Sequence, residues 1–143
     1  MKNRPIRLAA ILFALVIANF HALANQTQTE DIELSGVVRQ TLSNYKENGL
    51  SGLVVLSQNC YRVQRPSLRC VQLDIAASQI DLQFAESIGI KRHPYFEPGP
   101  FFQRATPVFV RSGMNMQQAN AYLTRATEKI SRLISFQTDM SHP

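Results

Sequence analysis

Two carboxylates in the middle of the chain could form a catalytic pair if their spacing allowed it. Asp74 and Asp81 fall in one stretch of helical periodicity, where a rise of about 1.5 Å per residue puts them about 10.5 Å apart. Carboxylate pairs that hydrolyse glycosidic bonds are about 5–9.5 Å apart. The spacing therefore favours carboxylates that are solvated, or paired with Arg62, Arg65 or Arg69, over a catalytic pair.

His93 is the one histidine placed to act as a general base or a metal ligand, because His21 falls in the leader and His142 is the penultimate residue. It lies between a basic pair and a proline, and the chain has no G-x-S-x-G motif. Phosphate-binding and dinucleotide-binding glycine patterns are also missing. We therefore expect no catalytic residue, no metal and no cofactor. A hydrolase whose site the sequence does not reveal is the third-ranked alternative.

The first 24 residues have the layout of a secretory signal peptide. Three basic residues precede an uncharged apolar run over residues 8–20, and Ala22-Leu23-Ala24 forms a small-x-small cleavage site. The run is shorter than the roughly 20 residues that span a bilayer. We expect cleavage before Asn25, a periplasmic or secreted protein, and no stable membrane span after cleavage.

More than half of the net positive charge of the chain lies in this leader. The whole chain carries +5, but the leader holds three of the fifteen basic residues and none of the ten acidic ones, which leaves +2 on residues 25–143. A nearly neutral domain lacks the basic excess typical of nucleic-acid binding. We expect no nucleic-acid partner.

The only two cysteines, Cys60 and Cys70, are separated by nine residues. An even number of cysteines in an exported chain favours a disulfide. Redox-active pairs are usually separated by two residues. The spacing therefore predicts a structural bridge between Cys60 and Cys70.

Apolar periodicity predicts a mainly α fold, a small bundle of three to four helices with one disulfide. Residues 25–143 form a single domain with loose ends at 25–30 and 137–143. A first helix ends at Asn48-Gly49, and one helical face from Leu73 to Ile88 is closed by Gly89. A last helix follows the N-cap pair Asn115 and Gln118.

Two segments between these helices are harder to assign. Residues 52–57 are apolar and short, which fits a buried helix or a strand, and the alternative fold is α+β with a two-stranded ribbon of 52–57 and 107–111. Residues 91–107 contain four prolines, which are incompatible with a continuous helix or a central strand. We expect this segment to be a loop.

The segment between the cysteines is a candidate anion-binding site. It carries Arg62, Arg65 and Arg69, and no acidic residue occurs from Asn48 to Leu73. Arginines held on a tethered loop are suited to bind carboxylates or phosphates. The alternative is a solvated loop that balances the acidic helices.

A second candidate surface is aromatic. Tyr95, Phe96, Phe101 and Phe102 fall within eight residues and are four of the ten aromatic residues after the leader. They form either an interface on a proline-stiffened loop or a plug at one end of the bundle. We expect Phe96 and Phe102 to point inward, and Tyr95 and Phe101 to be exposed.

The combined prediction is a non-enzymatic exported binding protein. Its partner is another envelope or extracellular protein, and an inhibitor or an immunity-type protein would fit this description. The alternative is a binder of a small anionic ligand or an envelope polymer, held by the arginines.

Overall fold

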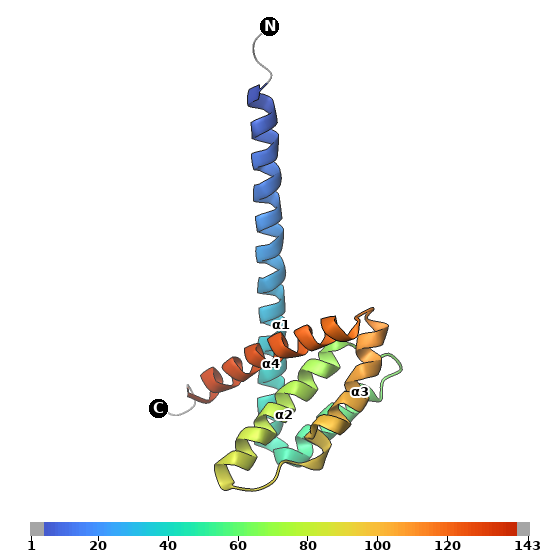
Figure 1. Cartoon of the computed structure of the whole chain (residues 1–143). Coiled ribbons are helices and arrows are strands. Elements are labelled where there is room, and N and C mark those ends of the chain that lie inside the picture. The colour runs from blue at the N-terminus through green and yellow to red at the C-terminus, as the bar shows by residue number, and fades with distance from the viewer. Residues whose placement is uncertain (1–4, 140–143) are drawn as a thin grey trace. The chain divides into compact units, whose positions relative to one another are not determined.

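The computed structural model describes the backbone of residues 5–139 and the side chains of residues 28–137. Within these residues the fold is all helical, with four α-helices and one short 3-10 helix (Figure 1). The elements are α1 (Pro5–Tyr61), α2 (Leu68–Ile88), η1 (Pro94–Phe96), α3 (Pro98–Arg111) and α4 (Met116–Asp139). The predicted helical bundle with one disulfide is confirmed.

The chain divides into two units, residues 1–33 and residues 34–143. The first unit consists of the N-terminal part of α1 and contains the predicted signal peptide, of which residues 1–4 lie outside the described residues. The predicted loose end at 25–30 lies within α1, and residues 140–143 of the other loose end are outside the described part. Among the described residues, no helix combines the length and hydropathy that crossing a membrane requires.

The second unit begins with the C-terminal part of α1, which is kinked at Gly49. Gly49 has φ 63° and ψ −160°, a conformation that side chains with a Cβ rarely adopt. The helix resumes at once and continues to Tyr61. A Cβ on Gly52 would clash with the Cβ of Asn48, so the resumed helix also needs a glycine there. The predicted end at Asn48-Gly49 is therefore a kink between two helical segments.

The alternative fold with a ribbon of residues 52–57 and 107–111 is wrong, because α1 contains the first segment and α3 the second. In α1, Leu53 and Ser57 lie one turn apart and are both buried, so a single helical face accounts for the apolar run. In α3, Val108 and Phe109 are buried, whereas their neighbours Pro107 and Val110 are exposed.

The predicted loop over residues 91–107 is correct only for residues 91–93 and Glu97, because Pro94–Phe96 form η1 and α3 begins at Pro98. Pro98 and Pro100 occupy the first turn of α3, where a backbone N–H has no helical partner to lose. Pro107 lies inside the helix on its exposed side. There, a missing N–H leaves the carbonyl one turn earlier open to solvent, which reduces the cost. Pro98 and Pro100 therefore mark the start of α3, and Pro107 does not exclude the helix.

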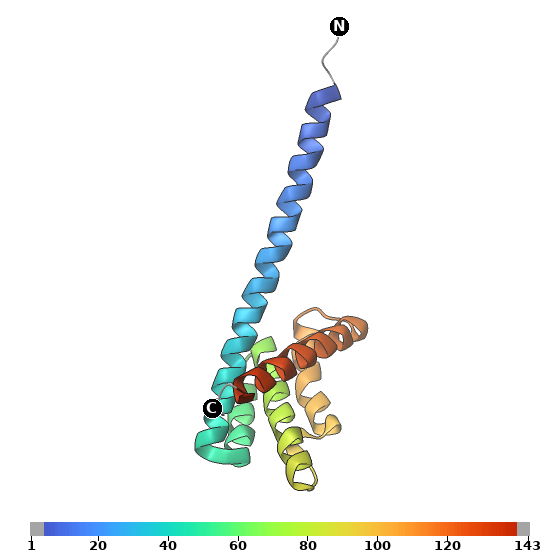
Figure 2. The same cartoon turned by 90° about the vertical axis from the view of Figure 1, so that its left-hand side faces the viewer.

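The core is built around α2, which contacts α3, α4 and η1 (Figure 2). Gly89 caps α2 in the left-handed conformation, as predicted. Leu73 and Ala77 are buried on the predicted face, and Ile75 is buried on another side. Helix α2 is therefore covered on more than one side, which is why its sequence carries apolar residues outside the predicted face as well as on it.

Helix α4 packs across α2 and supplies Ala126, Ile130 and Ile134 to the core. Its start is the predicted reciprocal cap, in which the Asn115 N–H donates to Gln118 Oε1 and the Gln118 N–H donates to Asn115 Oδ1, each at 2.9 Å. Two backbone donors at the start of the helix are thereby satisfied by side chains.

Candidate functional site

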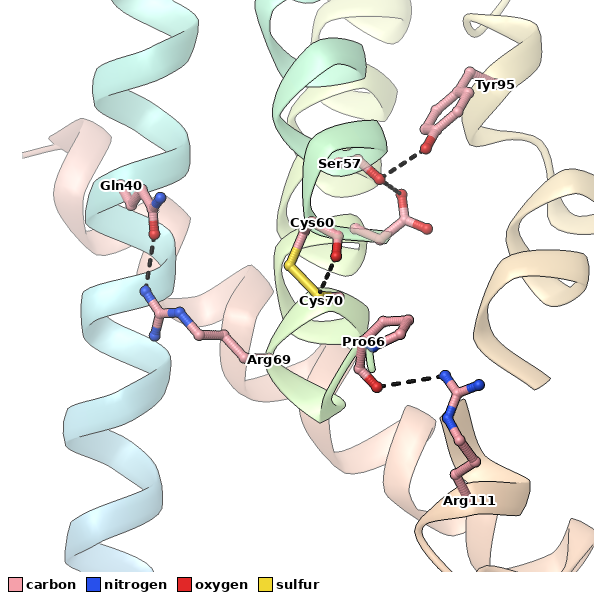
Figure 3. The surroundings of a disulfide bond; sticks show 9 residues. Gln40, Ser57, Cys60, Pro66, Arg69, Cys70, Tyr95 and Arg111 are labelled. Carbon is pink, nitrogen blue, oxygen red and sulfur yellow. Dashed lines mark hydrogen bonds between the residues drawn. A yellow bond between two sulfur atoms is a disulfide. The ribbon is translucent and has the colours of Figure 1, made fainter. Parts of the chain in front are cut away.

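The predicted disulfide is present and joins the end of α1 to the start of α2 (Figure 3). Cys60 and Cys70 have a Cα–Cα distance of 5.4 Å, within the ordinary range for a bridge. Cys70 is buried, and Cys60 packs against the edge of the core. The loop between them is therefore tied at its base to the centre of the fold.

Replacing both cysteines by alanine should lower the free energy of unfolding by about 2.5–3 kcal/mol, the loop-closure entropy expected for a ring of this size. Urea unfolding followed by circular dichroism measures the difference. Reduction of the wild-type chain should give the same loss, and no change on reduction would contradict a stabilising role for the bridge.

The three candidate anion-binding arginines lie around this loop and are exposed. The Arg69 guanidinium donates to Gln40 Oε1 of α1 at 2.8 Å, on one side of the loop (Figure 3). On the other side, Arg111 of α3 donates to the carbonyl of Pro66 at 3.4 Å (Figure 3). The structure thus adds a fourth arginine, Arg111, which is far from this loop in the sequence.

None of the three loop arginines pairs with Asp74 or Asp81, so that part of the prediction is wrong. Both carboxylates are buried, and each is paired with an arginine further along the chain. The reason is the fold: α3 and the segment before η1 pack on the face of α2 that carries the aspartates. Of the two states expected for these carboxylates, solvated or ion-paired, the structure shows the ion-paired one.

Asp74 lies at the centre of a buried polar cluster. Arg104 of α3 donates from Nε to Oδ2 at 3.1 Å and from Nη2 to Oδ2 at 2.9 Å, and its guanidinium lies 3.7 Å from the centre of the Tyr95 ring. The Ser57 hydroxyl donates to Asp74 Oδ1 at 3.0 Å. Because that hydroxyl has one hydrogen, the contact at 2.9 Å between Ser57 and Tyr95 has the tyrosine as its donor.

Burial raises the pKa of the Asp74 carboxyl, while the positive charge of Arg104 opposes that shift. Burial also raises the pKa of the Tyr95 and Tyr61 hydroxyls, and the nearby Asp74 carboxylate adds to the effect. Both tyrosines therefore stay protonated, and the Tyr95 hydroxyl donates to Ser57. Ser57 is fully buried, so its hydroxyl is not accessible to a substrate, and the cluster links α1, α2, η1 and α3.

Asp81 links α2 to the segment before η1 through an ion pair and hydrogen bonds. Arg92 Nε lies 3.4 Å from Asp81 Oδ2, and the His93 N–H donates to both carboxylate oxygens at 3.1 and 3.2 Å. The His93 Nδ1 accepts from the Tyr95 N–H at 3.2 Å. His93 thus caps η1, as expected of a loop residue, and in residues 28–137 no three His, Cys, Asp or Glu side chains gather as metal ligands.

The four candidate interface aromatics do not form one exposed loop. Phe96 is buried at 1% exposure in η1, as predicted. Tyr95 is half-buried over Arg104, and Phe101 packs against the core, so their expected exposure is wrong. Phe102 is 47% exposed, contrary to the inward orientation predicted. The helical start of α3 turns Phe101 and Phe102 to different sides, which a loop assignment could not foresee.

Phe102 lies where two surface hollows meet. One hollow, between α3 and α4, is lined by Phe109, Val110, Met114 and Met116. The other reaches α2 and is lined by Ile75, Gln79 and Phe101 among others. Phe102 and Leu123 line both hollows. We call the combined area the Phe102 surface.

The Phe102 surface is almost free of charge. Arg92 is the single charged residue among those that line the two hollows, and it is paired with Asp81. Val110 and Met116 are largely exposed at its edge.

Comparison of the chain with models of protein families, with curated proteins and with solved structures finds no match. The function is therefore inferred from the chain itself.

Proposed function

We propose that this chain is an exported, non-enzymatic binding protein that contacts another envelope or extracellular protein through the Phe102 surface. The observation that carries this proposal is the position of Phe102, half exposed and shared by two adjoining hollows. A large aromatic side chain on a protein surface is a frequent centre of binding energy. The predicted signal peptide and the disulfide support export.

The chemistry of the surface favours an apolar segment as the occupant. Phe102, Val110 and Met116 are exposed together beside a nearly uncharged lining. Methionine side chains adapt to the shape of an apolar partner because they are flexible and polarisable. A charged occupant would lose its hydration at this surface without gaining a partner of opposite charge.

The shape of the surface favours a helix as the form of that segment. The hollow between α3 and α4 is bounded by Thr106 and Val110 on one helix and by Asn120 and Leu123 on the other, residues spaced at helical intervals. A groove of this kind accepts the apolar side of an amphipathic helix, with anchors three, four and seven residues apart. The partner proposed is therefore a protein with an exposed amphipathic helix.

Replacing Phe102 by alanine should weaken binding of the partner by at least about thirtyfold, the loss of about 2 kcal/mol typical of a hot spot. The partner is first isolated by crosslinking from envelope extract, using the tagged full chain with a photoreactive phenylalanine analogue at position 102. Its affinity for wild-type and F102A chains is then measured by titration calorimetry. The unfolding midpoint of the F102A variant should stay close to wild type, because the side chain is exposed.

The matched control is Phe136→Ala, since Phe136 is 61% exposed on α4 and does not line either hollow. F136A should bind the partner with wild-type affinity. Equal affinities of wild type and F102A, or equal losses in F102A and F136A, would contradict the proposal.

A further inference from the structure

We infer that the loop between the two cysteines docks on an anionic lipid surface, independently of the proposed function. The loop and its neighbour α3 carry Arg62, Arg65, Arg69 and Arg111, and all four side chains are exposed. Arg69 and Arg111 lie on opposite sides of the loop, held by Gln40 and by the Pro66 carbonyl (Figure 3). Arg62 and Arg65 belong to the loop between them.

Among the side chains of residues 28–137, no carboxylate is paired with the arginines of this face. Residues 48–73 contain no carboxylate. The next two along the chain, Asp74 and Asp81, are buried and paired with Arg104 and Arg92. Across residues 28–137, none of the four exposed arginines has a carboxylate within ion-pairing distance. This face therefore presents its full charge to a partner, and that partner is anionic.

An apolar side chain on the same loop favours lipid over an acidic polypeptide. Val63 is 53% exposed and lies next to Arg62, two residues before Arg65. Basic side chains at the headgroups with an apolar side chain beneath them are the arrangement of interfacial membrane binders. An acidic polypeptide would use the arginines but would gain little from Val63.

The disulfide makes the loop suitable for such docking. Because Cys60–Cys70 ties both ends of the loop to α1 and α2, the arginines lose less conformational freedom on binding than they would on an open segment. The loop also lies at the edge of the second unit, beside α3 (Figure 1). Its tip can therefore meet a flat surface.

The test compares binding of the full chain to vesicles of phosphatidylcholine alone and to vesicles in which half of the lipid is phosphatidylglycerol. The measured quantity is the gain in the partition coefficient when phosphatidylglycerol is added. Each arginine at an anionic surface contributes about fivefold to partitioning. In the R62Q/R65Q variant this gain should therefore be about thirtyfold smaller than in the wild-type chain. The leader is present in every variant, so the difference between variants reports on the loop.

The control R125Q/R132Q removes the same charge from exposed positions on α4 and should retain most of the gain. V63S should weaken binding to the mixed vesicles while keeping the salt dependence, because the charges are unchanged. Equal losses in the two double variants would overturn the inference, since net charge alone would then explain binding. Displacement of the chain from vesicles by polyglutamate or glycerol phosphate at matched charge would also overturn it, in favour of a soluble anion.

Discussion

Replacing Arg104 with methionine should lower the free energy of unfolding at neutral pH by about 3–5 kcal/mol, the loss typical of a buried ion pair from which one partner is removed. Asp74 is fully buried, and Arg104 supplies most of its hydrogen bonds. Methionine keeps much of the volume but leaves the carboxylate without a counter-charge. Chemical unfolding followed by circular dichroism measures this loss.

The loss in R104M should shrink as the pH falls. Burial raises the pKa of Asp74 and Arg104 lowers it, so removing Arg104 raises it further. A carboxyl with a higher pKa in the folded than in the unfolded state binds more protons when folded. The stability of the variant therefore rises as the pH falls toward the unfolded pKa of about 3.9. The difference from wild type should thus be smaller at about pH 5 than at about pH 8.

Arg111→Met is the matched control, because it makes the same change on the exposed side of α3. Its effect should stay within about 0.5 kcal/mol, as is usual for surface positions. Equal losses in R104M and R111M, or a loss in R104M that does not depend on pH, would contradict a structural role for the buried pair.

Replacing Phe96 with alanine should cost about 3–5 kcal/mol of folding free energy, the range for a fully buried phenylalanine. Phe96 is 1% exposed and its ring packs edge-on against Tyr95, with ring centres 5.1 Å apart. Its removal leaves a cavity between η1 and α2 and also loosens Tyr95, which reaches the Asp74 cluster. Thermal and urea unfolding both report the change.

Phe102→Ala is the comparison for this prediction, because it removes the same side chain from the neighbouring segment. F96A should unfold far more easily than wild type, whereas F102A should be nearly as stable as wild type. If the two variants were equally destabilised, the division of the aromatic segment into a buried and an exposed half would be wrong.

Helix positions and the disulfide could be predicted from the sequence because their signals are local. Gly89 and the Asn115–Gln118 pair act on backbone groups within a few residues, and the structure shows both at the expected helix ends. Cys60 and Cys70 are the only cysteines, so the pairing needed no knowledge of the fold. The amphipathic stripes had the 3.6-residue period that identifies helices.

The sequence prediction misses helix α3 because it treats its prolines only as helix breakers. Pro98 and Pro100 break a helix that is already running, yet they suit the first turn of one that begins there. The signal was present: Phe102, Thr106 and Val110 recur every four residues after this pair of prolines. Recognition of that pattern would have placed these residues on one face.

The partners of the buried aspartates could not be predicted from local sequence. Asp74 pairs with Arg104, thirty residues away, only because α3 folds back along α2. Three arginines that are closer to Asp74 in the sequence could equally have supplied the positive charge that this carboxylate needs. Of the candidate functional residues, the loop arginines were predictable from charge alone, whereas the exposure of Phe102 depended on the direction of a helix that had not been assigned.

The loop closed by Cys60 and Cys70 also determines how the chain responds to proteases. Exposed loop tips are preferred cleavage sites, and an enzyme that cuts after arginine finds Arg62 here, whereas the bond after Arg65 is protected by Pro66. A cut after Arg62 falls between the two cysteines, so the fragments remain covalently joined. The buried ion pairs and the core on each side of the cut are left intact. The cleaved chain therefore remains folded and covalently linked until its disulfide is reduced.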